Sequence, residues 1–343
     1  MTATEWVASL SPWPEEFGLE RMHALLDVLG NPQRAFPSIH VVGTNGKSTA
    51  VRTIAALLRA EGLDAGAYTS PHVSGWHERL DTDPDSFERA VAAVRAAAEA
   101  TGATQFETLT AAALNSFAER NVDVAILEAG LGGRLDATNV VDAPVVLLTN
   151  VGLEHTDVLG DTREQIAREK LAVAKPGATV LLPDDEWRDL VPHANVEIGG
   201  AREAAEAFAG HPLEADVEIA LPGRLERRGA DEVRDGAHTP EGIDWLLQRI
   251  EPRDWVVVAS VLRDKDADAM LGRLSTAAKT FIATRSSNPR ALDEGDLAAR
   301  AERYFQRVER IPEPHRALRR GRELGPVLVT GSLYLLADLH GTE

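Results

Sequence analysis

The sequence predicts an α/β protein of two domains, and three observations lead to this prediction. The chain has 343 residues, more than one globular domain usually holds. Short apolar runs typical of buried strands alternate with amphipathic segments along most of its length. A glycine-rich turn at residues 43–48 joins the first such run to a helix, as in a phosphate-binding loop. We therefore expect a P-loop-containing parallel-sheet ATPase domain followed by a smaller Rossmann-like α/β domain.

The first domain is expected to span residues 1–221. Its predicted strands cover residues 38–43, 122–127, 145–148 and 179–182, and its predicted helices cover residues 47–59, 107–119 and 163–174. The last of these helices is closed by Lys175-Pro176-Gly177, because proline and glycine do not continue a helical turn. Residues 183–221 are polar and alanine-rich and carry only a weak pattern.

The second domain is expected to span residues 222–343, with the boundary at Pro222-Gly223. The alternation of strands and helices starts again there. Strands are predicted at residues 232–234, 255–259, 280–283 and 327–329, with helices between them. This pattern favours a second, smaller sheet with parallel strands.

Composition excludes several classes of protein. The net charge of −18 would repel a nucleic-acid backbone, so we expect no nucleic-acid partner. No apolar run approaches the roughly 18 residues that cross a bilayer, and the first residues lack the pattern of a secretory signal. The chain has no cysteine, which rules out disulfides and thiolate metal sites and suits a cytoplasmic protein.

The strongest local signal is the turn formed by Gly43, Thr44, Asn45, Gly46, Lys47, Ser48 and Thr49. Its glycines let backbone N–H groups surround phosphates, Lys47 can reach the terminal phosphates, and the Ser48 hydroxyl can bind magnesium. The spacing departs from the common phosphate loop, because Val41 stands five positions before Gly46. The alternative is a simple turn with a surface lysine. We expect an ATP site.

Two later strand ends carry side chains that bind divalent ions. Glu128 ends one predicted strand and precedes a glycine-rich stretch, and His155 follows the next strand. Carboxyl ends of parallel strands share one edge of a sheet, so both could join Ser48 around magnesium. Taken alone, Glu128 could be a helix cap or a turn residue, and His155 an ordinary histidine. A lysine in a helix, such as Lys170, is by itself expected to be a solvated surface charge, and periodicity gives no reason to assign it another role.

Together these motifs resemble the folylpolyglutamate synthase/dihydrofolate synthase family, a branch of the Mur-type ligases. The resemblance covers most of the chain, in family order, and is carried by Leu19 to Met22, Leu29 to Gln33, Gly43 to Ser48, Thr69 to His72, Glu78-Arg79, Phe106-Glu107, Glu128 to Asn139, Gly152 to His155, Leu159 to Thr162, Glu169-Lys170, Pro222 to Arg224, Asp235 to His238, Leu262 to Asp266 and Val329 to Tyr334. Such a set is far more specific than any one motif.

The resemblance implies an ATP-dependent ligase that activates the carboxylate of a pteroate or folate as an acyl phosphate and joins it to L-glutamate. It leaves open whether the chain is a dihydrofolate synthase, a folylpolyglutamate synthase or both. It implies a Mur ligase-like fold, a monomer, and two magnesium ions beside ATP. The implied catalytic residues are Lys47, His155 and Lys170.

The resemblance also assigns binding roles. The implied magnesium ligands are Ser48, Glu128, His155 and Lys170, the last carried as a carbamate. The implied nucleotide contacts are Gly43 to Thr49, Asn139, Arg224, Asp235 and His238. The implied wall of the pterin site is formed by Arg21, Ser70, Pro71 and His72.

Three departures from the family pattern keep other interpretations open. Ser48 follows Lys47 directly, without the usual intervening glycine, Thr239 stands where asparagine is usual, and residues 183–221 are short for the end of the first domain. A peptidoglycan Mur ligase is one alternative, although 42 residues before Gly43 are too few for its extra domain. A phosphate-loop kinase or switch protein and a nucleotide-binding protein with little ligase activity are the others.

Overall fold

The computed structural model describes residues 1–14 and 16–340 and divides into two compact units. The first comprises Met1–Ser70 and Trp76–Ile219. The second comprises Pro71–Gly75 together with the described residues from Ala220 onward. The sequence did not predict that a short segment from the first part of the chain groups with the second unit.

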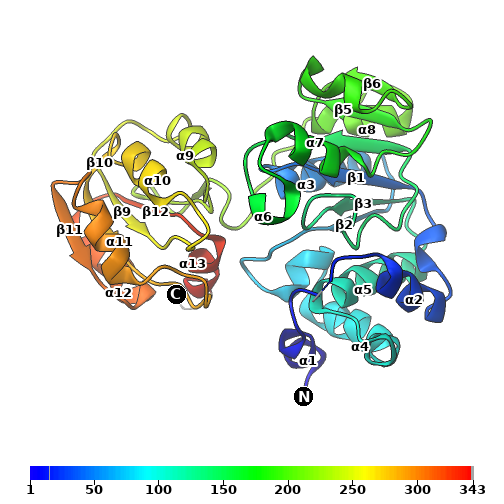
Figure 1. Ribbon diagram of the computed structural model, residues 1–343, viewed down its shortest axis with the longest axis horizontal. Coiled ribbons are helices and arrows are strands. Elements are labelled where there is room, and N and C mark those ends of the chain that lie inside the picture. Colours follow the sequence, from blue (N-terminus) through cyan, green and yellow to red (C-terminus); the bar gives the residue numbers. More distant parts are fainter. Residues whose placement is uncertain (15, 341–343) are drawn as a thin grey trace. The chain divides into compact units, whose positions relative to one another are not determined.

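The first unit is built on a parallel sheet of six strands in the order β2-β3-β1-β4-β5-β6 (Figure 1). Their bounds are β1 Ser38–Val42, β2 Ala65–Tyr68, β3 Val124–Glu128, β4 Val145–Leu148, β5 Thr179–Leu182 and β6 Asn195–Ile198. The central strand β1 pairs Val41 with Glu128 of β3 and Val42 with Leu148 of β4. The carboxyl ends of these three strands therefore lie side by side at one edge.

Helices cover both faces of this sheet. One face packs against α3 (Lys47–Ala60) and α8 (Ala201–Ala209). The other packs against a larger layer made of α1 (Ala3–Ser9), α2 (Glu20–Val28), α4 (Pro84–Thr101), α5 (Gln105–Arg120) and α7 (Arg163–Leu171). The connections along the chain also contain the short helix α6 (Thr156–Leu159) and the 3-10 helices η1 (Pro32–Arg34), η2 (Trp76–Leu80) and η3 (Asp185–Leu190).

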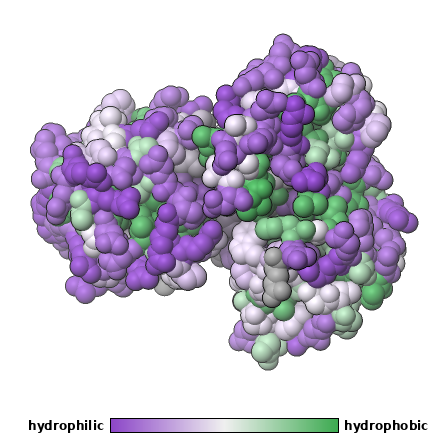
Figure 2. Space-filling model, viewed as in Figure 1, coloured by the Kyte–Doolittle hydropathy of each residue, from purple (hydrophilic) through white to green (hydrophobic). Residues whose placement is uncertain are grey.

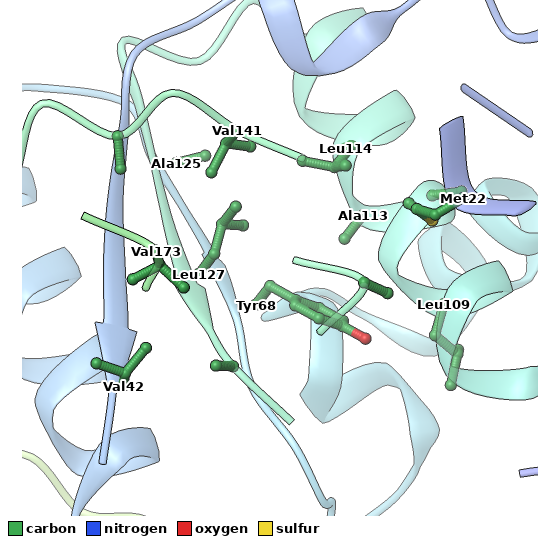
Figure 3. Close-up of a cluster of buried hydrophobic side chains, with 14 of the residues drawn as sticks. Met22, Val42, Tyr68, Leu109, Ala113, Leu114, Ala125, Leu127, Val141 and Val173 are labelled. Carbon is green, nitrogen blue, oxygen red and sulfur yellow. The ribbon is translucent and has the colours of Figure 1, made fainter. Parts of the chain in front are cut away.

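Alternation along β1 explains why a strand of five buried residues lies at the centre. Ile39 and Val41 enter the core beneath α3, whereas Val42 enters the core on the opposite face. A strand that is buried on both faces is rich in apolar residues, and Ile39, Val41 and Val42 supply this signal in β1 although Ser38 and His40 are buried as well. Figure 3 shows the core on the face opposite α3, where Tyr68 and Leu127 lie between the strands and α5.

The weakly patterned stretch of residues 183–221 forms η3, β6 and α8. The strand β6 is an edge strand that pairs only with β5, and its side chains are exposed or half-exposed. An edge strand has one neighbouring strand, and the side chains of this one are largely exposed, so few of them need to be apolar and its sequence lacks a clear period. The helix α8 packs on α3 through Ala204 and Ala205.

The second unit holds a sheet of six strands in the order β11-β10-β9-β12-β8-β7. Their bounds are β7 Glu226–Arg227, β8 Glu232–Arg234, β9 Trp255–Ala259, β10 Ala278–Ala283, β11 Arg307–Arg310 and β12 Val327–Thr330. All pairings are parallel except that of β7 with β8. The predicted fold class of two α/β sheets is confirmed.

Helices also cover both faces of the second sheet. One face packs against α9 (Pro240–Leu247), α10 (Ala267–Leu274) and α11 (Glu294–Ala301), and the other against α12 (Pro314–Leu324) and α13 (Leu333–Asp338). Val73, from the segment Pro71–Gly75, is 5% exposed and belongs to the second of these cores. A Cβ on Gly223 would lie 3.2 Å from Cγ2 of Val73.

The face drawn in Figure 2 is predominantly hydrophilic on both units. This agrees with the 54 acidic and 36 basic residues of the chain. Within residues 1–14 and 16–340, no helix combines the length and the apolar character needed to cross a membrane.

Candidate active site

The glycine-rich turn between β1 and α3 is held in place by the residues that follow β4. The N–H groups of Thr44 and Asn45 donate to the carbonyl and side-chain oxygens of Asn150, at 3.1 and 2.9 Å. The Thr149 hydroxyl donates to the Asn45 carbonyl at 2.7 Å. Gly43 adopts φ +146°, and a Cβ there would lie 1.9 Å from the Thr149 hydroxyl oxygen. Only glycine therefore fits at position 43.

Lys47 opens α3 and bends back over this turn. Its Nζ donates to the carbonyl oxygens of Gly43 and Thr44, at 2.9 and 3.2 Å. Gly46, immediately before the helix, has φ +82° and open space around its Cβ position. The ammonium group and the first N–H groups of a 14-residue helix thus lie at the same turn. A helix N-terminus with a lysine beside it favours phosphate.

Glu128 ends β3 beside the start of α3, and its carboxylate is buried, with the residue 2% exposed. One oxygen accepts a hydrogen bond from the Ser48 hydroxyl at 3.1 Å. The other accepts one from the backbone N–H of Ser70 at 2.9 Å. Ser70 was predicted only as a wall of the substrate site, and its contact with Glu128 could not be read from the sequence. Carboxylate and hydroxyl oxygens suit magnesium.

The turn that follows Glu128 is organised around a buried carboxylate, Asp136. One of its oxygens accepts the N–H groups of Gly130 and Leu131, at 3.0 and 2.8 Å. The other accepts the N–H of Thr138 at 3.0 Å and also its hydroxyl. Burial raises the pKa of Asp136, and these hydrogen bonds oppose the rise. Asp136 was not among the predicted site residues, and nothing in its spacing distinguishes it from a turn residue.

The same turn contacts α7 at Lys170. A Cβ on Gly133 would lie 2.6 Å from the Lys170 carbonyl oxygen and 2.7 Å from that of Glu169. The Arg134 N–H donates to the Glu169 carbonyl at 2.9 Å. The backbone at 133–134 therefore packs directly against the end of α7, and glycine is required because of this close approach.

Lys170 is not a solvated surface charge: it is 1% exposed. Its Nζ donates to the Gly43 carbonyl at 3.0 Å and to the Glu154 carboxylate at 2.6 Å. Burial lowers the pKa of Lys170, and Glu154 opposes this shift. Burial alone would raise the pKa of Glu154, but the charges of Lys170 and Lys47 hold it at about 2. Lys170 thus joins the phosphate turn through a buried ion pair that the sequence did not reveal.

His155 is next to Glu154 and begins the short helix α6 in a left-handed conformation, φ +45°. Across residues 1–14 and 16–340, no three carboxylate or imidazole groups lie close enough together to hold a metal ion. Magnesium commonly takes one or two protein carboxylates and completes its shell with water and phosphate oxygens, so the oxygen donors at Glu128 and Ser48 fit this ion.

The other predicted residues of the first unit lie in three places. Thr49 is exposed on the first turn of α3. The Asn139 side-chain amide donates a hydrogen bond to the Arg134 carbonyl at 2.9 Å, and its oxygen accepts one from Nζ of Lys175 at 3.2 Å. Arg21 of α2 donates through Nε to the Glu107 carboxylate, at 2.8 and 3.0 Å, and so ties α2 to α5.

The remaining predicted residues belong to the second unit. Pro71 and His72 lie in the segment that groups with it. Arg224, Asp235 and His238 lie on the turns that flank β7 and β8. Asp235 accepts the N–H groups of Leu225 and Ala237, at 2.7 and 2.8 Å, and Nδ1 of His238 lies 2.8 Å from the Gly236 carbonyl oxygen. Burial raises the pKa of Asp235, with the Arg224 charge among the opposing effects.

Comparison with known proteins places the chain in a family. Residues 41–209 match the Mur ligase middle domain, and residues 223–333 match the Mur ligase, glutamate ligase domain. The folylpolyglutamate synthase of Lacticaseibacillus casei is 34% identical over an alignment of 424 positions that covers all of this chain and 99% of that protein. The chain belongs to the folylpolyglutamate synthase family of Mur ligases. The resemblance inferred from the sequence is confirmed.

Solved structures of this family share the fold. The Escherichia coli FolC structure in complex with DHPP and ADP has a TM-score of 0.87 and 26% identity, and covers 99% of this chain and 97% of that one. A bifunctional folylpolyglutamate synthase/dihydrofolate synthase with manganese, AMPPNP and L-glutamate bound has a TM-score of 0.85 and 27% identity, with the same coverage. Family membership makes the chain an ATP-dependent ligase that uses a divalent metal ion.

Proposed function

We propose that this folylpolyglutamate synthase relative joins L-glutamate to the carboxylate of a pteroate or folate, as a dihydrofolate synthase, a folylpolyglutamate synthase or both. One observation carries the proposal. Lys47, Glu128 and Lys170 come from three separate elements of the first unit, and their side chains meet at or beside the turn that follows β1. A phosphate turn with a buried carboxylate and a second lysine suits phosphoryl transfer to an acid.

In this proposal the chain's own residues bind and orient the reactants. The N–H groups of residues 43–49 and Nζ of Lys47 hold the phosphates of ATP, and Ser48, Glu128 and His155 hold magnesium. The bound ion supplies positive charge that offsets the charge of the phosphates. Lys47 must leave its two carbonyl partners to reach the terminal phosphate, so ATP binding exchanges those hydrogen bonds for stronger, charge-assisted ones.

The acid carboxylate then attacks the terminal phosphate, and ADP leaves. The acyl phosphate carries a good leaving group, so the neutral amine of glutamate attacks the acyl carbon, the bond from that carbon to the phosphate oxygen breaks, and the nitrogen releases a proton as the amide forms. Positioning supplies much of the rate in such a transfer. In this proposal Arg21, Ser70, Pro71 and His72 would contact the acid.

Lys170 is proposed to act as a carbamate that helps to place a second magnesium ion. A neutral amine adds to carbon dioxide and releases a proton, which leaves a carboxylate-like group. Burial lowers the pKa of Lys170, and this favours the neutral amine that the addition needs. The ion pair with Glu154 would have to open first.

The remaining assignments belong to the same proposal. Residues 1–221 would form the ATP-binding domain and residues 222–343 the C-terminal-type α/β domain of a Mur ligase. Asn139, Arg224, Asp235 and His238 would contact the nucleotide. We also propose that the enzyme works as a monomer in the cytoplasm, without a nucleic-acid or membrane partner.

The test is a reaction of the purified protein with Mg-ATP, L-glutamate and either dihydropteroate or a reduced folate. ADP formation and the mass of the product are measured together. We expect ADP formation that requires both the acid and glutamate, and a product heavier by one glutamyl unit. Lys47→Met should lose about 100-fold or more in kcat/KM. Turnover that requires a different acid or amino acid would point to another Mur-type ligase, and ATP binding without turnover to a nucleotide-binding protein.

A further inference from the structure

Arg52 lies on α3, four residues beyond Ser48, and none of the predicted roles uses it. Its side chain is 10% exposed. The guanidinium donates to the Glu78 carbonyl oxygen, lies 3.5 Å from the Thr69 hydroxyl and pairs with the Asp81 carboxylate. Burying a guanidinium is costly unless its donors are satisfied. The terminal nitrogens of Arg52 find all these partners within one stretch of chain, residues 69–81, whereas its Nε has no hydrogen-bond partner.

Residues 69–81 leave β2, form a loop and return through η2. The base of this loop is closed by the Thr69 N–H, which donates to the Arg79 carbonyl at 2.9 Å. Asp81 adopts φ +50°, which few residues tolerate. Its carboxylate also pairs with Arg59, farther along α3, at 2.8 Å. Arg52 and Asp81 therefore fasten both ends of the loop to the helix that begins at the phosphate turn.

Ser70 is the residue of this loop that contacts the candidate metal site. Its N–H donates to one oxygen of Glu128, while the Ser48 hydroxyl donates to the other. The contacts thus form a closed ring, from α3 through Ser48 to Glu128, and back through Ser70 and the adjoining Thr69 to Arg52 on the same helix. Rotation of the Glu128 carboxylate requires at least one member of this ring to move.

The charge of Arg52 adds to these contacts. Burial lowers the pKa of Arg52 to about 10, and the negative charges of Glu78 and Glu128 oppose that shift. Arg52 therefore remains a cation at neutral pH, close enough to Glu128 for their charges to interact. Mutation of a group that holds a metal ligand in place typically lowers the metal affinity about 10–100-fold.

We propose that Arg52 is a positioning residue. Its contacts with residues 69–81, here called the clamp, hold the N–H of Ser70 against Glu128 and thereby fix the orientation of the Glu128 carboxylate for magnesium. The inference rests on the proposed role of Glu128 in metal binding. It also gives α3 a second task, since the helix that carries the phosphate turn would set the geometry of the metal ligand. The segment Pro71–Gly75 starts directly after Ser70, so the clamp also fixes the point from which that segment departs.

The test compares Arg52→Met with Arg188→Met. Arg188 makes an ion pair with Asp185 within η3 and is 46% exposed, so the same substitution there should leave the site intact. ADP affinity is measured by calorimetry over a range of magnesium concentrations and in EDTA. For Arg52→Met we expect the magnesium concentration at half-effect to rise by about 10–100-fold, while ADP affinity in EDTA stays within about twofold of wild type.

Two further variants keep the test decisive if Arg52→Met does not fold. Asp81→Asn removes the charged partner, and asparagine tolerates a left-handed backbone. It should shift magnesium dependence in the same direction but less, and Arg52→Lys should be intermediate. Hydrogen exchange of a peptide covering residues 69–81 should accelerate in each variant, with no ligand present.

The proposal is overturned if Arg52→Met keeps the wild-type magnesium dependence, or if its ADP affinity in EDTA falls as much as in magnesium. The second result would indicate general loosening of the unit. These measurements need neither acid nor glutamate, so they are independent of ligase activity. A wild-type protein without ligase activity would contradict the proposed reaction while leaving this inference to be judged on nucleotide and metal binding.

Discussion

The carboxyl edges of the two sheets are built in different ways. In the first unit, charged and polar side chains from separate elements meet one another: Lys170 of α7 pairs with Glu154, and the Ser48 hydroxyl of α3 donates to Glu128 of β3. In the second unit, the charged groups at the corresponding edge serve their own turns. Asp235 accepts two nearby backbone N–H groups, and His238 contacts the Gly236 carbonyl.

This difference indicates a division of labour. At the first edge, charged side chains pair with one another, and a bound triphosphate and its cation could replace these partners. At the second edge, the charged side chains fix the shape of the backbone. Leu225 illustrates the second case, because it adopts φ +46° and its N–H is held by Asp235. Substitutions at the first edge should therefore act mainly through charge, and those at the second through lost hydrogen bonds.

The largest effect is expected for Lys170→Met. The substitution leaves the Glu154 carboxylate, 10% exposed, without its cation. Breaking a buried pair in this way costs about 3–5 kcal/mol of unfolding free energy. Ligase activity should be lost as well. Chemical unfolding and steady-state turnover measure the two effects.

The double variant Glu154→Gln/Lys170→Met serves as the control for charge. It removes both members of the pair, so much of the lost stability should return while activity stays low. A double variant as unstable as Lys170→Met alone would mean that packing, and not charge, makes Lys170 important.

Asp235→Asn is the matched experiment in the second unit. Its two oxygens each accept one backbone N–H, so an amide keeps one acceptor and places a donor against the other N–H. The expected loss is about 1–3 kcal/mol. Asp244→Asn, at an exposed ion pair with Arg273, should cost less than about 1 kcal/mol. If Asp235→Asn destabilises as much as Lys170→Met, the contrast between the two edges fails.

Gly133→Ala tests whether close backbone packing holds Lys170 in place. The new Cβ would lie 2.6 Å from the Lys170 carbonyl oxygen, and relieving such an overlap costs about 1–3 kcal/mol. Activity should fall more than stability, because the displaced residue carries a proposed role in catalysis. Gly272→Ala, where the nearest atom is 3.5 Å away, should leave activity unchanged. Equal effects of the two substitutions would refute the packing argument.

The effect expected at His40, which is fully buried in the first unit, appears only below neutral pH. Burial lowers its pKa to about 3 from 6.5, so between these values the unfolded chain binds a proton that the folded one does not. The unfolding free energy should therefore fall as the pH drops, with a slope of up to about 1.4 kcal/mol per unit from this residue. His40→Gln should flatten the slope over that range. An unchanged slope would mean that His40 is protonated in the folded protein.

Sequence patterns predicted most strands of the two sheets and missed several at or near their edges. β4, β5, β8 and β9 begin and end at the predicted residues. β2 has the sequence Ala-Gly-Ala-Tyr, which carries little strand signal. β11, Arg307–Arg310, is a polar edge strand. Both are edge strands that pair with one neighbour, and neither contains a run of large apolar residues.

The candidate site was predictable where one local pattern contains the chemistry. The turn from Gly43 to Ser48 and the carboxylate at the end of β3 are such cases. The pairing of Lys170 with Glu154 and the contact of Ser70 with Glu128 join residues 16 and 58 positions apart. No helical or strand period links such residues, so only the fold reveals them. The same holds for Asp136, whose importance lies in the backbone groups it collects.

The central claim is that the acid carboxylate takes the terminal phosphate of ATP before the amine attacks. It is tested most directly with an acid substrate labelled with oxygen-18 in both carboxylate oxygens, incubated with Mg-ATP and L-glutamate. Mass spectrometry of the released phosphate should find one labelled oxygen per molecule of amide formed. Amide formation with unlabelled phosphate would contradict the account.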